Sequence, residues 1–213
     1  MSVAAPLGSN ELAAVRFQGS NSVATLRELI TPSNYQLMGF GSAAEITTAT
    51  NGAPLLIYTI PLNRLIMYQT TNSFETLLEP DPQIDPAPVT RVILPILVST
   101  NVRSSTTLRL VPGQPLTWTN ANWGYSGLIR NLANTYSSIP GGEIKTDWPP
   151  FVVQIPVFDV WLIGYYNKAN KLVLRSTTDM RLGPVTVNRN QIISPEAMSQ
   201  LSLTAQRYNG RPN

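Results

Sequence analysis

Proline interrupts the three longest apolar runs of this chain, and this pattern constrains the fold more than any other feature. The runs are residues 55–70, 89–99 and 151–166, and each has a proline inside it. Their other residues are largely β-formers such as Val, Ile and Tyr. Because proline has no N–H to donate, it occurs in sheets only at edges, strand ends and bulges. Each run therefore predicts either two strands or one strand that is bent at a bulge or edge.

Shorter segments with β-forming residues lie between clusters of Gly, Pro, Asn and Ser. Residues 171–176 follow the third long run through a four-residue loop at 167–170, which predicts a β-hairpin. The other short segments that we expect to form strands are residues 23–30, 35–40, 106–111 and 181–187.

Few segments have the spacing of apolar residues that is typical of helices. Residues 72–78 and 126–135 predict short helices. The strongest helix signal covers residues 194–208, where Ser194 suits the N-cap and Pro195 the first helical position. A helical C-terminal segment is therefore expected.

Together these elements predict a mainly all-β fold. Long loops between strong strands favour an antiparallel, jelly-roll-like β-sandwich over an up-and-down barrel. A chain of 213 residues with 43% hydrophobic residues is long enough to form one such domain over residues 1–213. Residues 79–88 contain four prolines, and we interpret them as a long surface loop, with a domain linker as the alternative.

The chain contains no histidine and no cysteine, and only 13% of its residues are charged. The chain therefore lacks histidine as a proton shuttle at neutral pH and cysteine as a thiol nucleophile. It also lacks the imidazole and thiolate ligands of zinc, copper and iron. No phosphate-binding or nucleotide-binding glycine motif is present. We expect no enzymatic activity, no cofactor and no metal site.

Carboxylates are the only remaining groups with catalytic or calcium-binding potential. They include four acids near the Pro-rich loop and three near strong strands, without a ligand pattern such as the EF-hand. We expect the first group to be solvated, and we expect Asp159 to form an ion pair or to face outward. The seven residues are Glu75, Glu79, Asp81, Asp85, Asp147, Asp159 and Asp179.

Charge is unevenly distributed along the chain. Residues 1–100 carry four arginines and seven acids, whereas residues 101–213 carry eleven Lys and Arg and five acids. The basic residues are scattered and form no terminal arm, so nucleic-acid binding through such an arm is not expected. Opposite charges could instead meet between neighbouring copies. The start of the chain does not have the pattern of a signal peptide, and no apolar run predicts a membrane span.

Aromatic residues gather in one loop-like stretch that is rich in Asn, Gly and Ser. Exposed Trp and Tyr side chains there could anchor an interface or stack on a sugar. The alternative is that they belong to the core or pack beneath long loops. The candidate contact residues are Trp118, Trp123, Tyr125, Tyr136 and Trp148.

The proline-bent runs, the predicted hairpin and the loops rich in Ser, Thr, Asn and Pro resemble, in general character, single jelly-roll capsid proteins and other structural proteins of virions. That resemblance implies symmetric assembly with copies of itself and with other virion proteins, through loops and terminal segments. It places the chain in a virion that is assembled in the host cytoplasm. Residues 1–15 contain no Lys or Arg, so they lack the genome-binding arm of many RNA-virus coat proteins.

Two hypotheses follow from these observations. The first is a structural virion protein, either a capsid or a minor capsid subunit, that assembles with itself. The second is a β-sandwich module of a spike or decoration protein, which binds a host glycan or receptor through the loops that carry Trp and Tyr.

Overall fold

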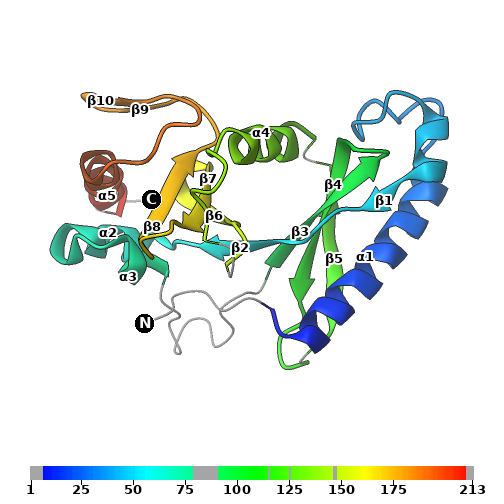
Figure 1. The fold of residues 1–213 in the computed structure, drawn as a ribbon, viewed down its shortest axis with the longest axis horizontal. Helices are drawn as coiled ribbons and strands as arrows, with labels where there is room; N and C mark the ends of the chain where they lie inside the picture. The colour runs from blue at the N-terminus through cyan, green and yellow to red at the C-terminus, as the bar shows by residue number, and fades with distance from the viewer. Residues whose placement is uncertain (1–6, 79–90, 115, 125, 146–147, 210–213) are drawn as a thin grey trace. The chain divides into compact units, whose positions relative to one another are not determined.

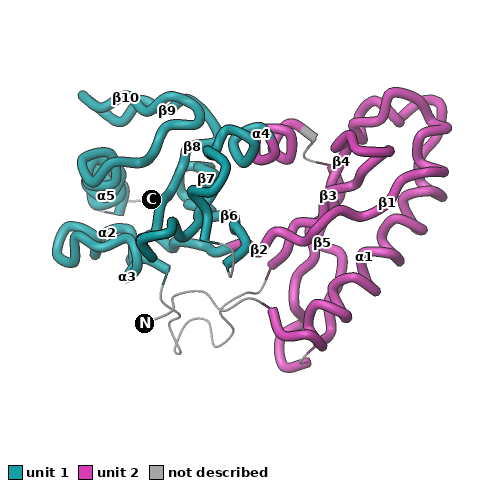
Figure 2. The backbone as a smooth tube through the Cα atoms, in the orientation of Figure 1, with its two compact units in different colours: residues 1–6, 58–88, 134–213 teal, residues 7–57, 89–133 magenta. Residues whose placement is uncertain are grey.

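The computed structural model of the chain describes residues 7–78, 91–114, 116–124, 126–145 and 148–209. The sequence predicts one domain, and the chain divides into two compact units (Figure 2). Unit 1 comprises Met1–Pro6, Tyr58–Pro88 and Asn134–Asn213, and unit 2 comprises Leu7–Ile57 and Val89–Ala133. The Pro-rich loop expected at 79–88 lies outside the described residues.

Unit 2 is a small sheet with one long helix packed against it (Figure 1). Strand β3 (Arg91–Val98) pairs antiparallel with β4 (Asn101–Leu110), which pairs antiparallel with β5 (Trp118–Trp123). On the other edge of β3 lie the short strand β1 (Thr50–Asn51) and the start of β2 (Leu55–Thr59). A 3-10 helix, η1 (Ala43–Thr48), precedes β1.

Helix α1 (Ser9–Leu29) packs against this sheet through a stripe of buried residues. The helix approaches closely at Gly19, where an added Cβ would lie 2.5 Å from Cδ1 of Leu94 on β3. Because interiors are close-packed, this position leaves no room for a larger residue. The buried residues of α1 are Val15, Gly19, Ser22, Val23 and Leu26.

Unit 1 is built on an antiparallel meander. Strand β6 (Phe151–Ile155) pairs with β7 (Val160–Tyr166), and β7 pairs with β8 (Leu172–Ser176). Strands β9 (Met180–Leu182) and β10 (Val185–Val187) form a separate two-stranded sheet.

Helices of unit 1 complete its core. Helix α2 (Leu62–Thr71) packs against α5 (Pro195–Asn209), and α3 (Phe74–Leu78) follows α2 directly. Helix α4 (Ser126–Ser137) begins in unit 2 and ends in unit 1, and η2 (Pro156–Phe158) links β6 to β7.

The order of hydrogen-bonded strands is β5-β4-β3-β2-β6-β7-β8, with β1 paired to β3. The chain is therefore rich in sheet, as predicted, but a jelly-roll sandwich is not confirmed. The expectation of a few short helices is also only partly right, because α1 has 21 residues. The buried residues of α1 have the spacing of one helical face, but the β-forming side chains of residues 23–30 concealed this pattern.

Proline explains the second error in the predicted elements. In the run 55–70, the chain forms β2 and then α2, whose N-cap is Pro61. The predicted second strand is therefore wrong, because a proline that cannot continue a sheet ladder is well tolerated at the start of a helix. In the run 89–99, by contrast, β3 continues through Pro95 with a shift of register next to it, between Ile96 and Leu97.

Local signals predict other elements correctly. The predicted β7–β8 hairpin forms, with Tyr166 paired to Leu172, and its loop spans the five residues 167–171 where four were predicted. Helix α5 forms over the segment with the strongest helix signal, and the Ser194 hydroxyl accepts a hydrogen bond from the Ala197 N–H at 3.2 Å.

Candidate functional site

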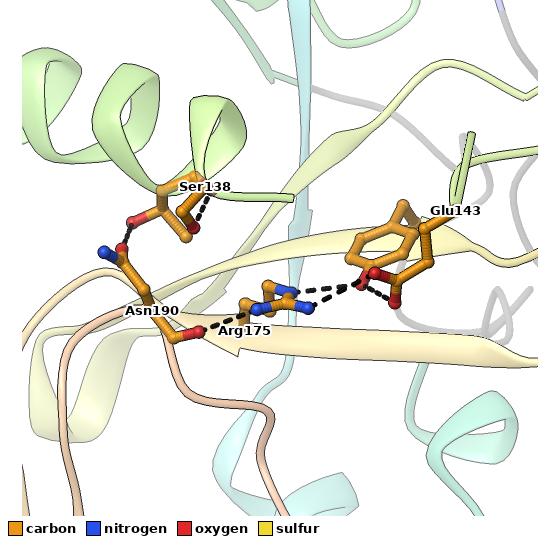
Figure 3. A network of polar contacts seen from close by, with 6 residues as sticks. Ser138, Glu143, Arg175 and Asn190 are labelled. Atoms are coloured by element: carbon orange, nitrogen blue, oxygen red, sulfur yellow. Dashed lines mark hydrogen bonds and ion pairs between the residues drawn. The ribbon is translucent and has the colours of Figure 1, made fainter. Parts of the chain in front are cut away.

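A network of polar contacts in unit 1 centres on Arg175 of β8 (Figure 3). Its Nε donates to the Tyr165 hydroxyl at 3.0 Å, and its Nη2 lies 3.4 Å from Oε2 of Glu143. The Tyr165 hydroxyl in turn donates to Oε1 of Glu143 at 2.6 Å. Arginine, tyrosine and glutamate therefore form a closed triangle of charge-assisted hydrogen bonds.

The same cluster continues to the end of α4. Nη1 of Arg175 donates to the backbone oxygen of Asn190 at 2.9 Å, and the Asn190 side-chain oxygen accepts from the buried Thr135 hydroxyl at 2.9 Å. The Ser138 hydroxyl donates to the Thr135 backbone oxygen at 2.7 Å. Figure 3 shows these groups pointing toward one another.

Burial raises the pKa of the Tyr165 phenol, and its hydrogen bond to the Glu143 carboxylate raises the pKa further. The phenol is therefore neutral at physiological pH and acts as a hydrogen-bond donor. Since Arg175 uses Nε, Nη1 and Nη2 on partners within the unit, the cluster is a satisfied internal network. Its physical role is to hold β7, β8 and the segments around residues 143 and 190 together.

Unit 2 contains a different kind of feature, an open groove between α1 and β1. Its volume is about 690 Å³, which lies in the range of ligand-binding sites. The helix contributes one face, with Arg16, Ser20, Val23 and Arg27 spaced by four, three and four residues. The other lining residues are Ala49, Thr50, Asn51, Gly52, Ala53, Pro54 and Leu94.

Arg27 is held in place within this groove. Its Nε donates to the backbone oxygen of Ile46 at 3.3 Å, and its Nη2 donates to that of Ala49 at 3.1 Å. These carbonyls orient the guanidinium but carry no net charge. The groove therefore has a fixed positive charge on one wall.

Asn51 contributes a polar atom that lacks a partner. Its side-chain oxygen is buried and, within the described part of the chain, accepts no hydrogen bond. A buried unpaired acceptor costs free energy, but this oxygen is closed to solvent beneath α1, so a molecule in the groove does not reach it.

The aromatic residues predicted as contacts do not share one environment. Trp118 of β5 is only 5% exposed, and Trp123 packs against the core cluster around Ile96. Both belong to unit 2, whereas Tyr136 and Trp148 belong to unit 1. Tyr125 lies outside the described residues.

Within unit 1, the two aromatic residues differ in exposure. Tyr136 is 50% exposed on α4, and the half-buried Trp148 ring packs on Tyr166 with centroids 5.6 Å apart. Tyr136 is thus the most accessible of the four described aromatic candidates, and the proposed sugar platform on these residues stays a prediction.

The acidic candidates are also dispersed. Asp159 is exposed and accepts a hydrogen bond from Nε1 of Trp161 at 3.0 Å, so it faces outward. Asp179 accepts from the Arg189 N–H at 2.7 Å, and Glu75 accepts from the Ser73 hydroxyl at 3.0 Å. Among the residues that the structure describes, no three acids come close enough to hold a metal ion. Glu79, Asp81, Asp85 and Asp147 lie outside the described residues.

No family model, no curated protein and no solved structure matches this chain. None of the helices in the described ranges is both long and apolar enough to cross a membrane.

Sequence reasoning missed the groove, although a signal for it is present. Arg16 and Arg27 lie eleven residues apart, which is close to three helical turns, so they share a face of any helix that includes both. The signal was hidden because residues 23–30 resemble a strand.

Proposed function

We propose that this chain is a non-enzymatic structural protein that associates with copies of itself through the outer face of α1. Three turns of this outer face carry Ala13, Phe17, Asn21 and Ala24, which are all exposed and uncharged, and the exposed Glu28 follows on the same side one turn after Ala24. The Phe17 side chain is 70% exposed. A surface helix normally carries charged residues on its solvent side, so three uncharged turns around an exposed phenylalanine favour a protein partner.

The outer face can be paired with the same face of a second copy about a two-fold axis. The midpoint of α1 (Ser9–Leu29) is Gly19, and Phe17 and Asn21 lie two residues on either side of it. If two copies of α1 pack antiparallel about a two-fold axis, Phe17 of one copy meets Asn21 of the second copy. Ala13 then lies opposite the region of Ala24, where small side chains let the helices approach.

The virion setting is supported by the general character of the sequence, namely its proline-bent strands and its loops rich in Ser, Thr, Asn and Pro. The lack of histidine and cysteine and the closed network around Arg175 both support a non-catalytic role. A capsid or minor capsid subunit that contacts itself and other virion proteins fits these features.

Sedimentation velocity of the full chain and of Phe17→Ser over a concentration series tests the proposal. We expect the wild type to form dimers or larger species and Phe17→Ser to shift to the monomer at the same concentrations. Leu37→Ser is the matched control, because Leu37 of the same unit is 83% exposed but lies outside α1. Equal effects of the two substitutions, or a monomeric wild type, would contradict the proposal.

A further inference from the structure

We propose that the groove between α1 and β1 binds an acidic oligosaccharide, that is, a sugar chain with carboxylate or sulfate groups. The residues that line the groove lie beside the outer face of α1 but are not part of it. This inference therefore does not rest on self-association. Three properties of the groove carry it: its charge, the spacing of its cations and its neutral polar groups.

The charge of the groove is positive and uncompensated. Arg16 and Arg27 are both exposed lining residues, and the eleven described residues that line the groove include no acid. The nearby acid Glu45 is engaged elsewhere, since it forms an ion pair with Arg103 at 2.8 Å. Arginine is well suited to carboxylate and sulfate because its planar fork donates two parallel hydrogen bonds.

The spacing of the two arginines selects an elongated ligand. Eleven residues of α-helix rise by about 16 Å, so the Cα atoms of the two arginines lie about three turns apart along the helix. This separation favours a ligand with more than one anionic group over a single small anion. A chain of a few sugars with repeated anionic groups contacts both, with Ser20 and Val23 between them.

The neutral groups select a ligand that can donate as well as accept. The Thr50 hydroxyl is exposed and can both donate and accept, and the Ser20 hydroxyl donates to the Arg16 backbone oxygen and can still accept. A fully ionised carboxylate, sulfate or phosphate group can only accept, whereas a sugar hydroxyl can donate to either side chain and can accept from Thr50. Anionic groups and hydroxyls together are the chemistry of acidic saccharides.

Other polymers fit less well. Among the described residues that line the groove none is aromatic, so a nucleic-acid strand would find no ring there on which to stack a base. An acidic peptide offers N–H donors, but an extended chain presents them alternately to the two sides. The test below includes a peptide for this reason.

Isothermal titration of the full chain with two tetrasaccharides, one derived from heparin and one from hyaluronan, tests the proposal. We expect at least one to bind with one site per chain and to weaken as salt concentration rises. A neutral maltotetraose should not bind, and a tetraglutamate peptide should bind at least tenfold more weakly than the better acidic tetrasaccharide.

Substitutions locate the site. Arg16→Gln removes an exposed charge that makes no described side-chain contact, and we expect it to weaken binding about tenfold, the loss of one charged hydrogen bond. Arg27→Gln should weaken binding at least as much, with its folding checked by circular dichroism because it also loses the two backbone contacts. Thr50→Val removes an exposed lining hydroxyl and should weaken tetrasaccharide binding but leave binding of inorganic sulfate unchanged.

Arg109→Gln is the matched control. Arg109 is an exposed arginine on β4 of the same unit and does not line the groove. An unchanged affinity in this variant supports the assignment to the groove. The proposal is overturned if neither acidic tetrasaccharide binds, if Arg109→Gln weakens binding as much as Arg16→Gln, or if the peptide binds as tightly as the saccharides.

Discussion

The contact between Gly164 and Phe151 gives a stability prediction whose size can be worked from the structure. The two residues are directly opposite each other on β7 and β6, and the Phe151 ring covers the glycine. A Cβ added at Gly164 would collide with Cε2 of the ring and lie 2.8 Å from Cζ. Gly164→Ala therefore forces the ring to move.

The ring has little space into which it can move. Phe151 is 2% exposed, and its ring meets Tyr58 edge-on with centroids 4.9 Å apart. Overpacking of a core costs about 1–3 kcal/mol, and loss of an aromatic pair costs about 0.5–1.5 kcal/mol. Alanine recovers about 0.5–1 kcal/mol because it is less flexible than glycine in the unfolded chain. We expect a net loss of about 1–3 kcal/mol.

Urea unfolding followed by circular dichroism measures this loss as a lower midpoint at an unchanged slope. Gly141→Ala is the control, because no atom lies within 4 Å of a Cβ built at this exposed position. The double variant Gly164→Ala/Phe151→Leu should recover part of the stability, because the smaller side chain relieves the collision. A Gly164→Ala variant as stable as Gly141→Ala would refute the reasoning.

Three further predictions concern buried groups of the two units. Tyr58→Phe should raise the free energy of unfolding by about 1 kcal/mol in urea, since the buried Tyr58 hydroxyl has no hydrogen-bond partner among the described residues; a loss of stability would contradict this. Burial raises the pKa of Tyr58 and of Tyr165, so the folded chain holds these protons more tightly than the unfolded chain. The free energy of unfolding should therefore keep this contribution below about pH 10 and decline at higher pH. Urea unfolding together with tyrosinate absorbance measures the decline, and a free energy of unfolding that does not change with pH in this range would count against it. Gly19→Ala should destabilise the chain by about 1–3 kcal/mol despite the better helix propensity of alanine, because its Cβ would lie 2.5 Å from Leu94; a higher melting temperature would show that α1 does not pack as described.

The elements that the sequence predicts well are those with local causes. The Ser194 and Pro195 start signal of α5 and the short loop between β7 and β8 act over a few residues. Their outcome therefore does not depend on distant parts of the chain.

Helix α1 shows where local reasoning fails. It contains Gly19 and several Ser, Asn, Thr and Val residues, which are weak helix formers. Its stability comes from the burial of one face against the sheet of unit 2, and that surface is made by residues far along the chain. The jelly-roll expectation is not confirmed for the same reason, because the strand order depends on pairings that no short segment encodes.

The candidate groove could not be predicted from the order of residues along the chain either. Arg16 and Arg27 can be placed on one helical face, but the opposing wall at β1 exists only after β1 pairs with β3. The unpaired oxygen of Asn51 is likewise a property of packing. By contrast, the exclusion of imidazole and thiolate chemistry needed only the composition.

Self-association is the central claim, and the solution mass of the wild-type chain tests it most directly. Multi-angle light scattering across a concentration series gives that mass without reference to shape. We predict a mass that rises with concentration to twice the 23.4 kDa of one chain or to a higher multiple. A constant mass of 23.4 kDa up to the highest attainable concentration would contradict the claim.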